Sequence, residues 1–130
     1  MSRNDSFKKG KNNIEMILLS ILSNDDYYGY QLSQLVSEYS NNLITIPEGS
    51  LYPALYRLLD NGYISDEKRL IGKRLIRIYY HIEPSGKEYF ETLLSDYNRL
   101  NKGIQNILYY EKSDSEELEA EKWKKAQKIT

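Results

Sequence analysis

Apolar residues along the chain follow two different periods. They recur every three or four residues over 13–23, over 27–41, in a segment ending near Asn61 and in a long stretch from Pro84, as in amphipathic helices. Alternating runs at 63–68 and 75–82 are typical of strands, and Gly72-Lys73 between them marks a turn. The chain is therefore predicted to be α+β and mostly α, with three helices, a β-hairpin and a long C-terminal helix.

Polar residues, glycine and proline mark where the helices begin and end. Asn24-Asp25-Asp26 supplies N-cap chemistry for the second helix, and Gly29 in its first turn lets a neighbouring helix approach closely. Asn61-Gly62 predicts a left-handed C-cap for the third helix, and Pro84 suits the first position of the last helix.

The third helix has two candidate starting points. Thr45 and Glu48 have the spacing of a capping box, which begins the helix near residue 45. Ser50 is the alternative N-cap, and this later start leaves Pro53 in the first turn, where proline costs little. The residues alone leave both starts open.

The third helix has one apolar face and one polar face. Its leucines point inward, and its outward or flanking positions include Ser50, Tyr52, Tyr56 and Arg57. Such a helix followed directly by a basic hairpin indicates a DNA-binding device, in which the helix enters the major groove and the hairpin grips the backbone. We expect these four residues to contact DNA, with pairing to Asp60 as the alternative for Arg57.

The hairpin carries a local excess of positive charge. Residues 69–77 contain four cations and no acid, although the whole chain has a net charge of −1 and a pI of about 5.9. Because the local field attracts a phosphate backbone, Lys73, Arg74 and Arg77 are predicted to hold DNA phosphates. The alternatives are an ordinary solvated hairpin and, given the acidic pI, a winged-helix protein–protein interaction module without DNA contact.

The first and last helices have the apolar surface expected of a dimer. The first is apolar nearly all round, so we expect it to pack on its own domain and on a second subunit. The last repeats apolar residues close to the a and d positions of a coiled coil, which favours an intersubunit seam over packing on its own core. The expected dimerisation residues are Ile14, Ile17, Leu18, Leu93, Leu100, Ile104 and Ile107.

Composition argues against several classes of function. The 130 residues include no cysteine and one histidine, His81, so we predict no thiolate chemistry, no metal site and no cofactor. The common nucleophile, zinc-protease, P-loop and dinucleotide motifs are missing, and an enzyme is therefore not expected. Without a long apolar run or a secretory signal, a cytoplasmic location and no contact with a membrane are expected.

The chain is expected to have four parts. Residues 1–12 form a flexible basic arm, 13–82 a winged helix-turn-helix DNA-binding domain and 83–110 a C-terminal dimerisation helix. Residues 111–130 form a tail with many charges of both signs, which is expected to be a frayed helical extension or disordered.

Several motifs resemble those of the PadR-like transcriptional regulators, in the short form with a single C-terminal helix. The most specific is EGSLYPALYRL at 48–58; YGYQL at 28–32, GYI at 62–64, GKR at 72–74, YY at 79–80 and PSGK at 84–87 also match. The resemblance covers about residues 13–108. Glu83 departs from the pattern, since the family usually has a threonine there that caps the last helix.

The resemblance implies a winged-helix homodimer, formed by the first and last helices, that represses transcription by occupying a palindromic operator in double-stranded DNA. It also implies a pocket at the dimer centre for small planar, hydrophobic or phenolic ligands that release the repressor. An aromatic residue of the last helix stacks on such ligands, and Tyr97 occupies that position here. The alternative for Tyr97 is an aromatic side chain that only fills the seam.

Overall fold

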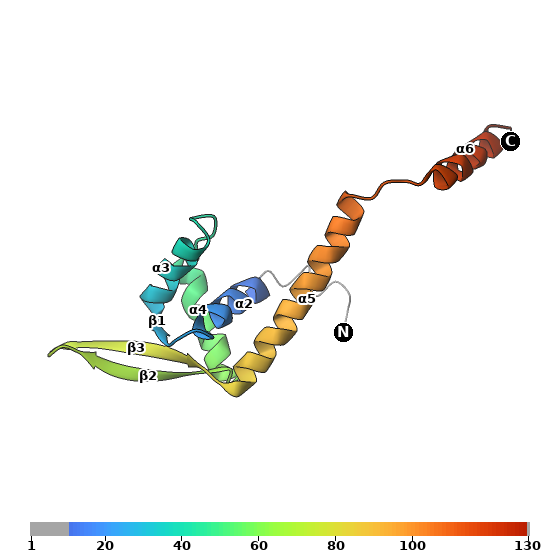
Figure 1. Ribbon diagram of the computed structural model, residues 1–130. Coiled ribbons are helices and arrows are strands. Elements are labelled where there is room, and N and C mark those ends of the chain that lie inside the picture. Colours follow the sequence, from blue (N-terminus) through green and yellow to red (C-terminus); the bar gives the residue numbers. More distant parts are fainter. Residues whose placement is uncertain (1–10, 130) are drawn as a thin grey trace. The chain divides into compact units, whose positions relative to one another are not determined.

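The computed structural model describes residues 11–129. The chain forms two compact units, of which the first ends at Asn98 and contains the candidate site described below. The second unit begins at Arg99. Along the chain (Figure 1) the elements are α2 (Lys11–Leu22), β1 (Tyr27–Tyr28), α3 (Gly29–Tyr39), α4 (Glu48–Asp60), β2 (Ile64–Ile71), β3 (Leu75–Ile82), α5 (Pro84–Leu108) and α6 (Asp114–Ile129). The predicted arm at 1–12 falls outside the described residues, except that α2 already begins at Lys11.

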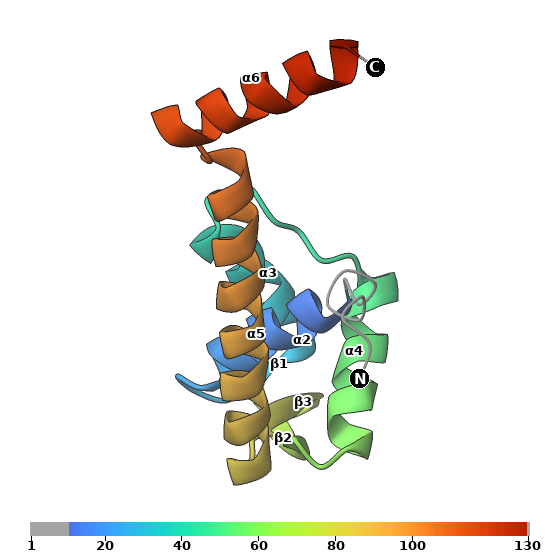
Figure 2. The ribbon, with the colours of Figure 1, turned by 90° about the vertical axis from the view of Figure 1, so that its right-hand side faces the viewer.

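Leucine side chains from α2, α3 and α4 form the core of the first unit. Figures 1 and 2 show α2 lying between α4 and the first part of α5. The inward face predicted for α4 is confirmed, because Leu51, Leu55 and Leu58 are almost wholly enclosed, while Leu59 is half-buried. The side chains that are less than 2% exposed are Leu18, Leu19, Leu22, Leu32, Leu51, Leu55 and Leu58.

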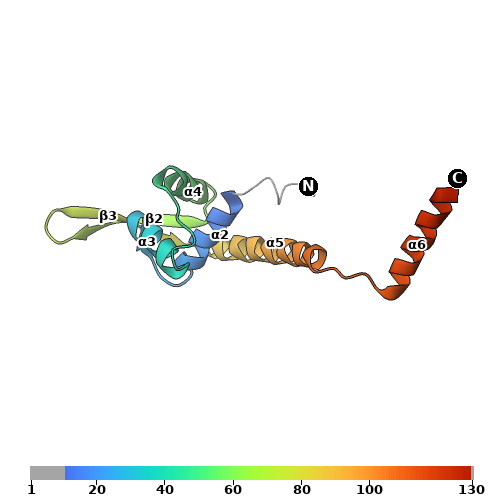
Figure 3. The same ribbon diagram turned by 90° about the horizontal axis from the view of Figure 1, so that it is seen from above.

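The predicted hairpin forms, with β3 over the expected residues 75–82 and β2 extending to Ile71, beyond its expected end near Lys68. β2 and β3 pair antiparallel from Ile64 opposite Ile82 to Ile71 opposite Leu75. The turn includes Gly72 at a φ of 69°, a left-handed conformation that glycine adopts without strain. Only the base of the hairpin is enclosed by the core, and its far part projects beyond the helices (Figure 3) as a wing.

The predicted start of the second helix is wrong. Tyr27 and Tyr28 form the short strand β1, which pairs with β3 opposite Tyr80 and Tyr79 and makes a three-stranded sheet in the order β1-β3-β2. Helix α3 begins only at Gly29, its N-cap Tyr28 is extended, and no side chain caps it. Two adjacent tyrosines suit a strand, and the open edge of β3 offers the backbone partners that they need.

Both predicted starts of α4 are also wrong, whereas its predicted end is confirmed. The N-cap is Pro47, without a side-chain hydrogen bond, so neither Thr45 nor Ser50 caps the helix. Pro53 therefore lies in the second turn, where its ring nitrogen cannot donate to the preceding turn. At the other end, Gly62 has a φ of 72°, and the amides of Gly62 and Tyr63 donate to the carbonyls of Leu59 and Leu58.

Helix α5 begins at Pro84 as predicted, and the charged tail contains a helix of its own. Glu83 lies just before α5 and accepts a hydrogen bond at 2.6 Å from the hydroxyl of Ser65 on β2. Helix α6 follows Ser113, whose hydroxyl accepts from the amide of Glu116 at 3.3 Å, so the tail contains a helix that is separate from α5, which ends at Leu108. Within the described part of the chain, no helix is both long and apolar enough to cross a membrane.

Candidate nucleic-acid interface

Two aromatic side chains line the outer part of α4. Tyr52 and Tyr56 lie about one turn apart, with their ring centroids separated by 6.4 Å. Tyr52 is half-buried because it packs over Gly29 of α3, where an added Cβ would lie 2.8 Å from its hydroxyl. The predicted close approach at Gly29 is thus confirmed, and the neighbour is a ring from α4. Tyr56 is 55% exposed, so it presents the larger free surface.

The other two positions predicted on this face differ in their surroundings. Ser50 is half-buried near the start of α4. Arg57 does not pair with Asp60; its Nε donates to Oε1 of Glu15 on α2 at 3.0 Å, and its side chain keeps 37% of its surface exposed. Arg57 is therefore held by a neighbouring helix and still reaches solvent.

The wing cations fall into two groups. Lys73 and Arg74 are exposed at the turn, and no ion pair among the described residues involves either of them. Arg77 is half-buried, with its guanidinium 4.3 Å from the centroid of the Tyr28 ring. The turn thus offers two exposed charges, and the strand offers a third whose direction is fixed by an aromatic ring.

Arg69 repeats this arrangement on the neighbouring strand. It lies opposite Arg77 in the β2–β3 ladder, and its guanidinium sits 4.3 Å from the centroid of Tyr79. The rings of Tyr79 and Tyr28 meet edge to face, with centroids 5.5 Å apart. Two arginines and two tyrosines therefore form one continuous cluster on the face of the wing that alternation predicts for Arg77 and Tyr79.

Asp26 ties the loop before β1 to the wing. Its two carboxylate oxygens contact Nδ1 of His81 at 2.7 Å and Nη2 of Arg69 at 2.9 Å. The pKa of Asp26 is lowered below its ordinary value, chiefly by the hydrogen bond with His81 and then by that with Arg69. Burial of the carboxylate opposes this shift. Asp26 therefore anchors the wing instead of capping a helix, as the sequence had predicted.

Replacing Asp26 with asparagine is expected to destabilise the protein by on the order of 1 kcal/mol at neutral pH. The pKa of Asp26 is lower in the folded state than in the unfolded state. Its ionised carboxylate therefore stabilises the fold at a pH above the unfolded-state pKa, and this stabilisation is lost as the pH falls through the folded-state pKa. The stability gap between wild type and variant should therefore close below about pH 4. Urea unfolding across pH tests this, with exposed Asp60→Asn as the control; a gap that does not change with pH would contradict it.

Three residues of this region escaped the sequence prediction. Glu15, Asp26 and Arg69 each make a contact with residues more than 40 positions away along the chain. One signal was present: Glu15 is an acidic residue within an otherwise apolar helix, and such a residue needs a buried partner.

Comparison with a family model, with a related protein and with solved structures identifies the family of this chain. The model of the transcriptional regulator PadR-like family matches residues 18–92. An uncharacterized protein from Lysinibacillus sphaericus is 30% identical over 94 residues, which cover 72% of this chain and 86% of that protein.

The chain belongs to the PadR-like family of transcriptional regulators.

Solved structures agree with this PadR-like assignment. A transcriptional regulator from Clostridium thermocellum matches with a TM-score of 0.68 and 32% identity, covering 76% of this chain and 95% of that one. PadR of Bacillus subtilis, solved in complex with operator DNA, shares the fold with a TM-score of 0.58 at 23% identity; the match covers 62% of this chain and 46% of PadR. PadR-like proteins are transcriptional regulators and not enzymes, as the missing catalytic motifs predicted.

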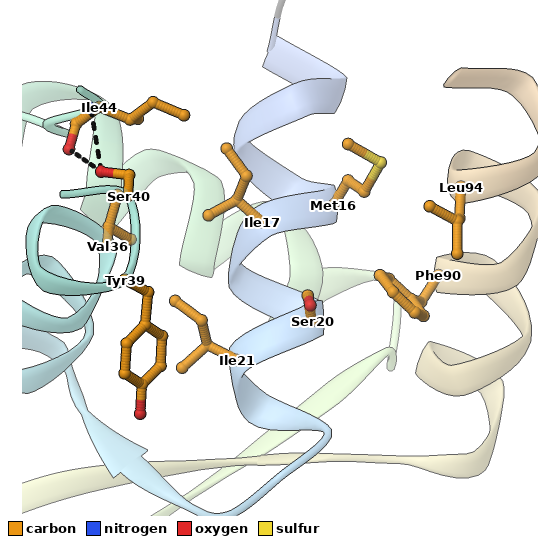
Figure 4. A pocket seen from close by; sticks show the side chains of 10 residues that line it. All are labelled: Met16, Ile17, Ser20, Ile21, Val36, Tyr39, Ser40, Ile44, Phe90 and Leu94. Atoms are coloured by element: carbon orange, nitrogen blue, oxygen red, sulfur yellow. Dashed lines mark hydrogen bonds between the residues drawn. The ribbon is translucent and has the colours of Figure 1, made fainter. Parts of the chain in front are cut away.

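An apolar pocket of about 290 Å³ lies beside α2 in this PadR-like protein. Figure 4 shows α2 between side chains of α3 and its following loop on one side and Phe90 and Leu94 of α5 on the other. Tyr97 lies outside this lining, although it follows Phe90 by seven residues and so falls on the same face of α5, where it is 44% exposed.

The residues predicted for dimerisation are not all accessible. Leu18 is fully enclosed and Leu93 is 9% exposed, so both pack in the core of their own subunit, and the prediction of an intersubunit role is wrong for Leu18. Ile14, Ile17 and Leu100 are half-buried. Ile104 is 38% and Ile107 is 78% exposed, so the free part of the apolar stripe lies toward the end of α5.

Proposed function

We propose that this protein is a dimeric repressor that occupies a palindromic operator in double-stranded DNA through α4 and the wing. The observation that carries the proposal is the wing turn, where Lys73 and Arg74 are exposed on the hairpin that follows α4, a helix with an exposed tyrosine, Tyr56. A helix can read base edges in the major groove while neighbouring cations hold phosphates. The B. subtilis PadR–operator complex, on the same fold, supports DNA as the partner.

The cluster of Arg69, Arg77, Tyr28 and Tyr79 supports the same function. The guanidinium of Arg77, stacked on Tyr28, makes no ion pair with a described residue, so its N–H edges are free for phosphate oxygens, and it loses little conformational freedom on binding. The guanidinium of Arg69 is already paired with Asp26 and Glu67, so it supports the wing from within the fold. Ser50, Tyr52, Tyr56 and Arg57 would then be the residues of α4 that approach the groove. A repressor acting on chromosomal DNA works in the cytoplasm.

Replacing Lys73 and Arg74 together with alanine is expected to weaken DNA binding by about 10-fold or more at moderate salt. Each lost phosphate contact removes about one unit from the slope of log affinity against log salt, so the slope should flatten by about two. Fluorescence anisotropy on specific and mixed-sequence duplexes measures both.

The matched control removes the same two charges from α5, as Arg99→Ala with Lys102→Ala, both of which are exposed. It should leave the slope close to that of the wild type. Equal slopes for the wing variant and the wild type would show that the wing does not touch the backbone.

A winged-helix protein–protein interaction module is the second candidate. It is favoured by apolar side chains on the far part of the wing, where Leu70 is 64%, Ile76 is 61% and Ile78 is 41% exposed. Mobility shifts of operator DNA at two salt concentrations separate the candidates, because a DNA-binding protein must lose affinity steeply as salt rises. A wild-type protein that shifts no DNA at low salt would favour the interaction module.

The proposed homodimer uses α2 and α5. The pocket beside α2 leaves apolar side chains uncovered within the subunit, and the a/d stripe continues along α5 to exposed Ile104 and Ile107. Burying both surfaces against a second copy would remove them from water and hold two α4 helices at a fixed spacing.

A small planar hydrophobic or phenolic ligand at the dimer centre would release the repressor. Tyr97 is the aromatic residue expected to stack on it. Such a ligand acts by binding one dimer geometry better than the DNA-bound one, since it shifts the equilibrium only by its differential affinity.

Tyr97→Ala is expected to leave operator binding largely intact and to abolish the response to planar aromatics that release the wild type. Titration of a panel of fluorescent planar aromatics, followed by operator anisotropy, measures binding and release. Tyr109→Ala, at an exposed position beyond α5, serves as the control. If no compound binds the wild type at roughly tens of micromolar, or if binding leaves operator affinity unchanged, the protein is a constitutive repressor.

A further inference from the structure

Glu15 is a buried carboxylate in an apolar helix. It is 6% exposed, and the core residues Leu18 and Leu19 follow it on α2. Both of its oxygens are used: Oε1 accepts from Nε of Arg57 on α4 at 3.0 Å, and Oε2 accepts from the hydroxyl of Tyr89 on α5 at 2.7 Å. One side chain thus joins three helices.

Stability alone is a poor explanation for this arrangement. Taking a carboxylate and a guanidinium out of water costs about as much as their attraction returns, and apolar side chains in their place often serve a fold equally well. A buried charge whose hydrogen bonds are all made does fix the orientation of its partner side chain, because only a few geometries of the partner satisfy those hydrogen bonds. The side chain whose orientation is fixed here is Arg57, on the helix proposed to read DNA.

Arg57, in its fixed orientation, still has nitrogen atoms available for a contact with DNA. Its inner nitrogen is occupied by Glu15, whereas its two terminal amino groups make no hydrogen bond with any described residue, and 37% of the side chain is exposed. A guanidinium held by one edge keeps the opposite edge free for a phosphate oxygen.

Tyr89 fixes the other end of the network. Its ring stacks on Tyr63 at a centroid distance of 4.2 Å, with the planes 10° apart. Burial, and then the hydrogen bond to Glu15, raises the pKa of Tyr89, so the phenol remains a proton donor. A shift of α5 at this point would pull on the same carboxylate that holds Arg57.

We infer that Glu15 is a positioning residue for DNA binding: it orients Arg57 toward a backbone phosphate and connects that contact to α5 through Tyr89. The inference rests on the proposed DNA-binding function. It goes beyond that function by assigning the link between the helix that dimerises and the helix that reads DNA.

A double-mutant cycle tests the positioning of Arg57. The probe is a fluorescein-labelled duplex carrying the genomic fragment that the wild type selects, titrated at several salt concentrations. Arg57→Gln is expected to lower affinity about 10-fold and to flatten the salt slope by about one. Glu15→Gln should produce the same change of slope, and the double variant should lose nothing further.

Tyr89→Phe tests the connection to α5 and does not depend on the folding of Glu15→Gln. It removes one hydroxyl, keeps the stack on Tyr63, and should weaken binding several-fold in the wild-type background but not in Arg57→Gln. Tyr63→Phe is the matched control, because it removes a hydroxyl outside the network and should leave affinity unchanged.

The outcomes separate this inference from the proposed function. A wild type without salt-dependent DNA binding would overturn the proposed function itself. If the wild type binds, the inference fails when folded Glu15→Gln keeps the wild-type slope, when it binds more tightly because Glu15 restrains Arg57 away from DNA, or when Tyr89→Phe acts equally in both backgrounds.

Discussion

Replacing Leu100 with glutamate is expected to convert the proposed dimer to monomers that no longer hold the proposed operator. Leu100 is half-buried on α5 and belongs to the a/d stripe that continues to Ile104 and Ile107. A charge at this position would have to be buried without a partner whenever two copies of α5 meet. Linking two DNA-binding modules typically raises avidity by about 10²–10⁴-fold, and the loss should be of that order.

The control for this variant adds the same charge outside the stripe. Gln105 is exposed on α5 and differs from glutamate only in the amide group, so Gln105→Glu should remain a dimer and bind operator nearly as well as the wild type. Light scattering after size-exclusion chromatography measures the mass, and anisotropy measures operator affinity. A Leu100→Glu protein that stays dimeric would place the interface elsewhere.

Local patterns were enough to predict most elements of this fold. The apolar periodicity located α2, α4 and α5, Pro84 marked the start of α5, and Asn61-Gly62 marked the end of α4. These features depend on neighbours within about one helical turn, so the sequence contains the information directly. The wing turn at Gly72 was found for the same reason.

Apart from the start of α4, which is a local error, the wrong predictions concern partners that are distant in sequence. Strand β1 has two residues and exists because β3 offers an unpaired edge more than 50 positions later, while the acids before it suggested a helix cap. Asp26, which was expected to cap, instead bonds Arg69 and His81 across 43 and 55 positions. Side-chain chemistry that serves a cap also serves an ion pair, and only the tertiary fold decides between them.

The candidate site follows the same division between local and distant contacts. Helical phase alone identified the outer face of α4, including exposed Tyr56, and composition alone identified the cationic turn. The sequence did not reveal that Arg57 is held by Glu15, which lies 42 positions earlier. Nor did it reveal that Leu18 faces the core of its own chain. An apolar helix has several faces, and its sequence does not say which face meets which neighbour.

Gly86→Ala is expected to be among the most destabilising single substitutions in the first unit, by roughly 3 kcal/mol. An added Cβ would lie 2.0 Å from the carbonyl oxygen of Tyr63, which is backbone and cannot rotate away. The same oxygen accepts from the amide of Glu83 at 2.9 Å, so moving it would also weaken the junction between the wing and α5.

Gly103→Ala makes the same substitution in the same helix and should have the opposite effect. No atom lies within 4 Å of the added Cβ at Gly103, so the change should stabilise α5 by up to about 1 kcal/mol through helix propensity. Urea unfolding of both variants at one protein concentration compares them, because the stability of the proposed dimer would depend on concentration. If Gly86→Ala unfolds at the same urea concentration as Gly103→Ala, the start of α5 is not packed against Tyr63.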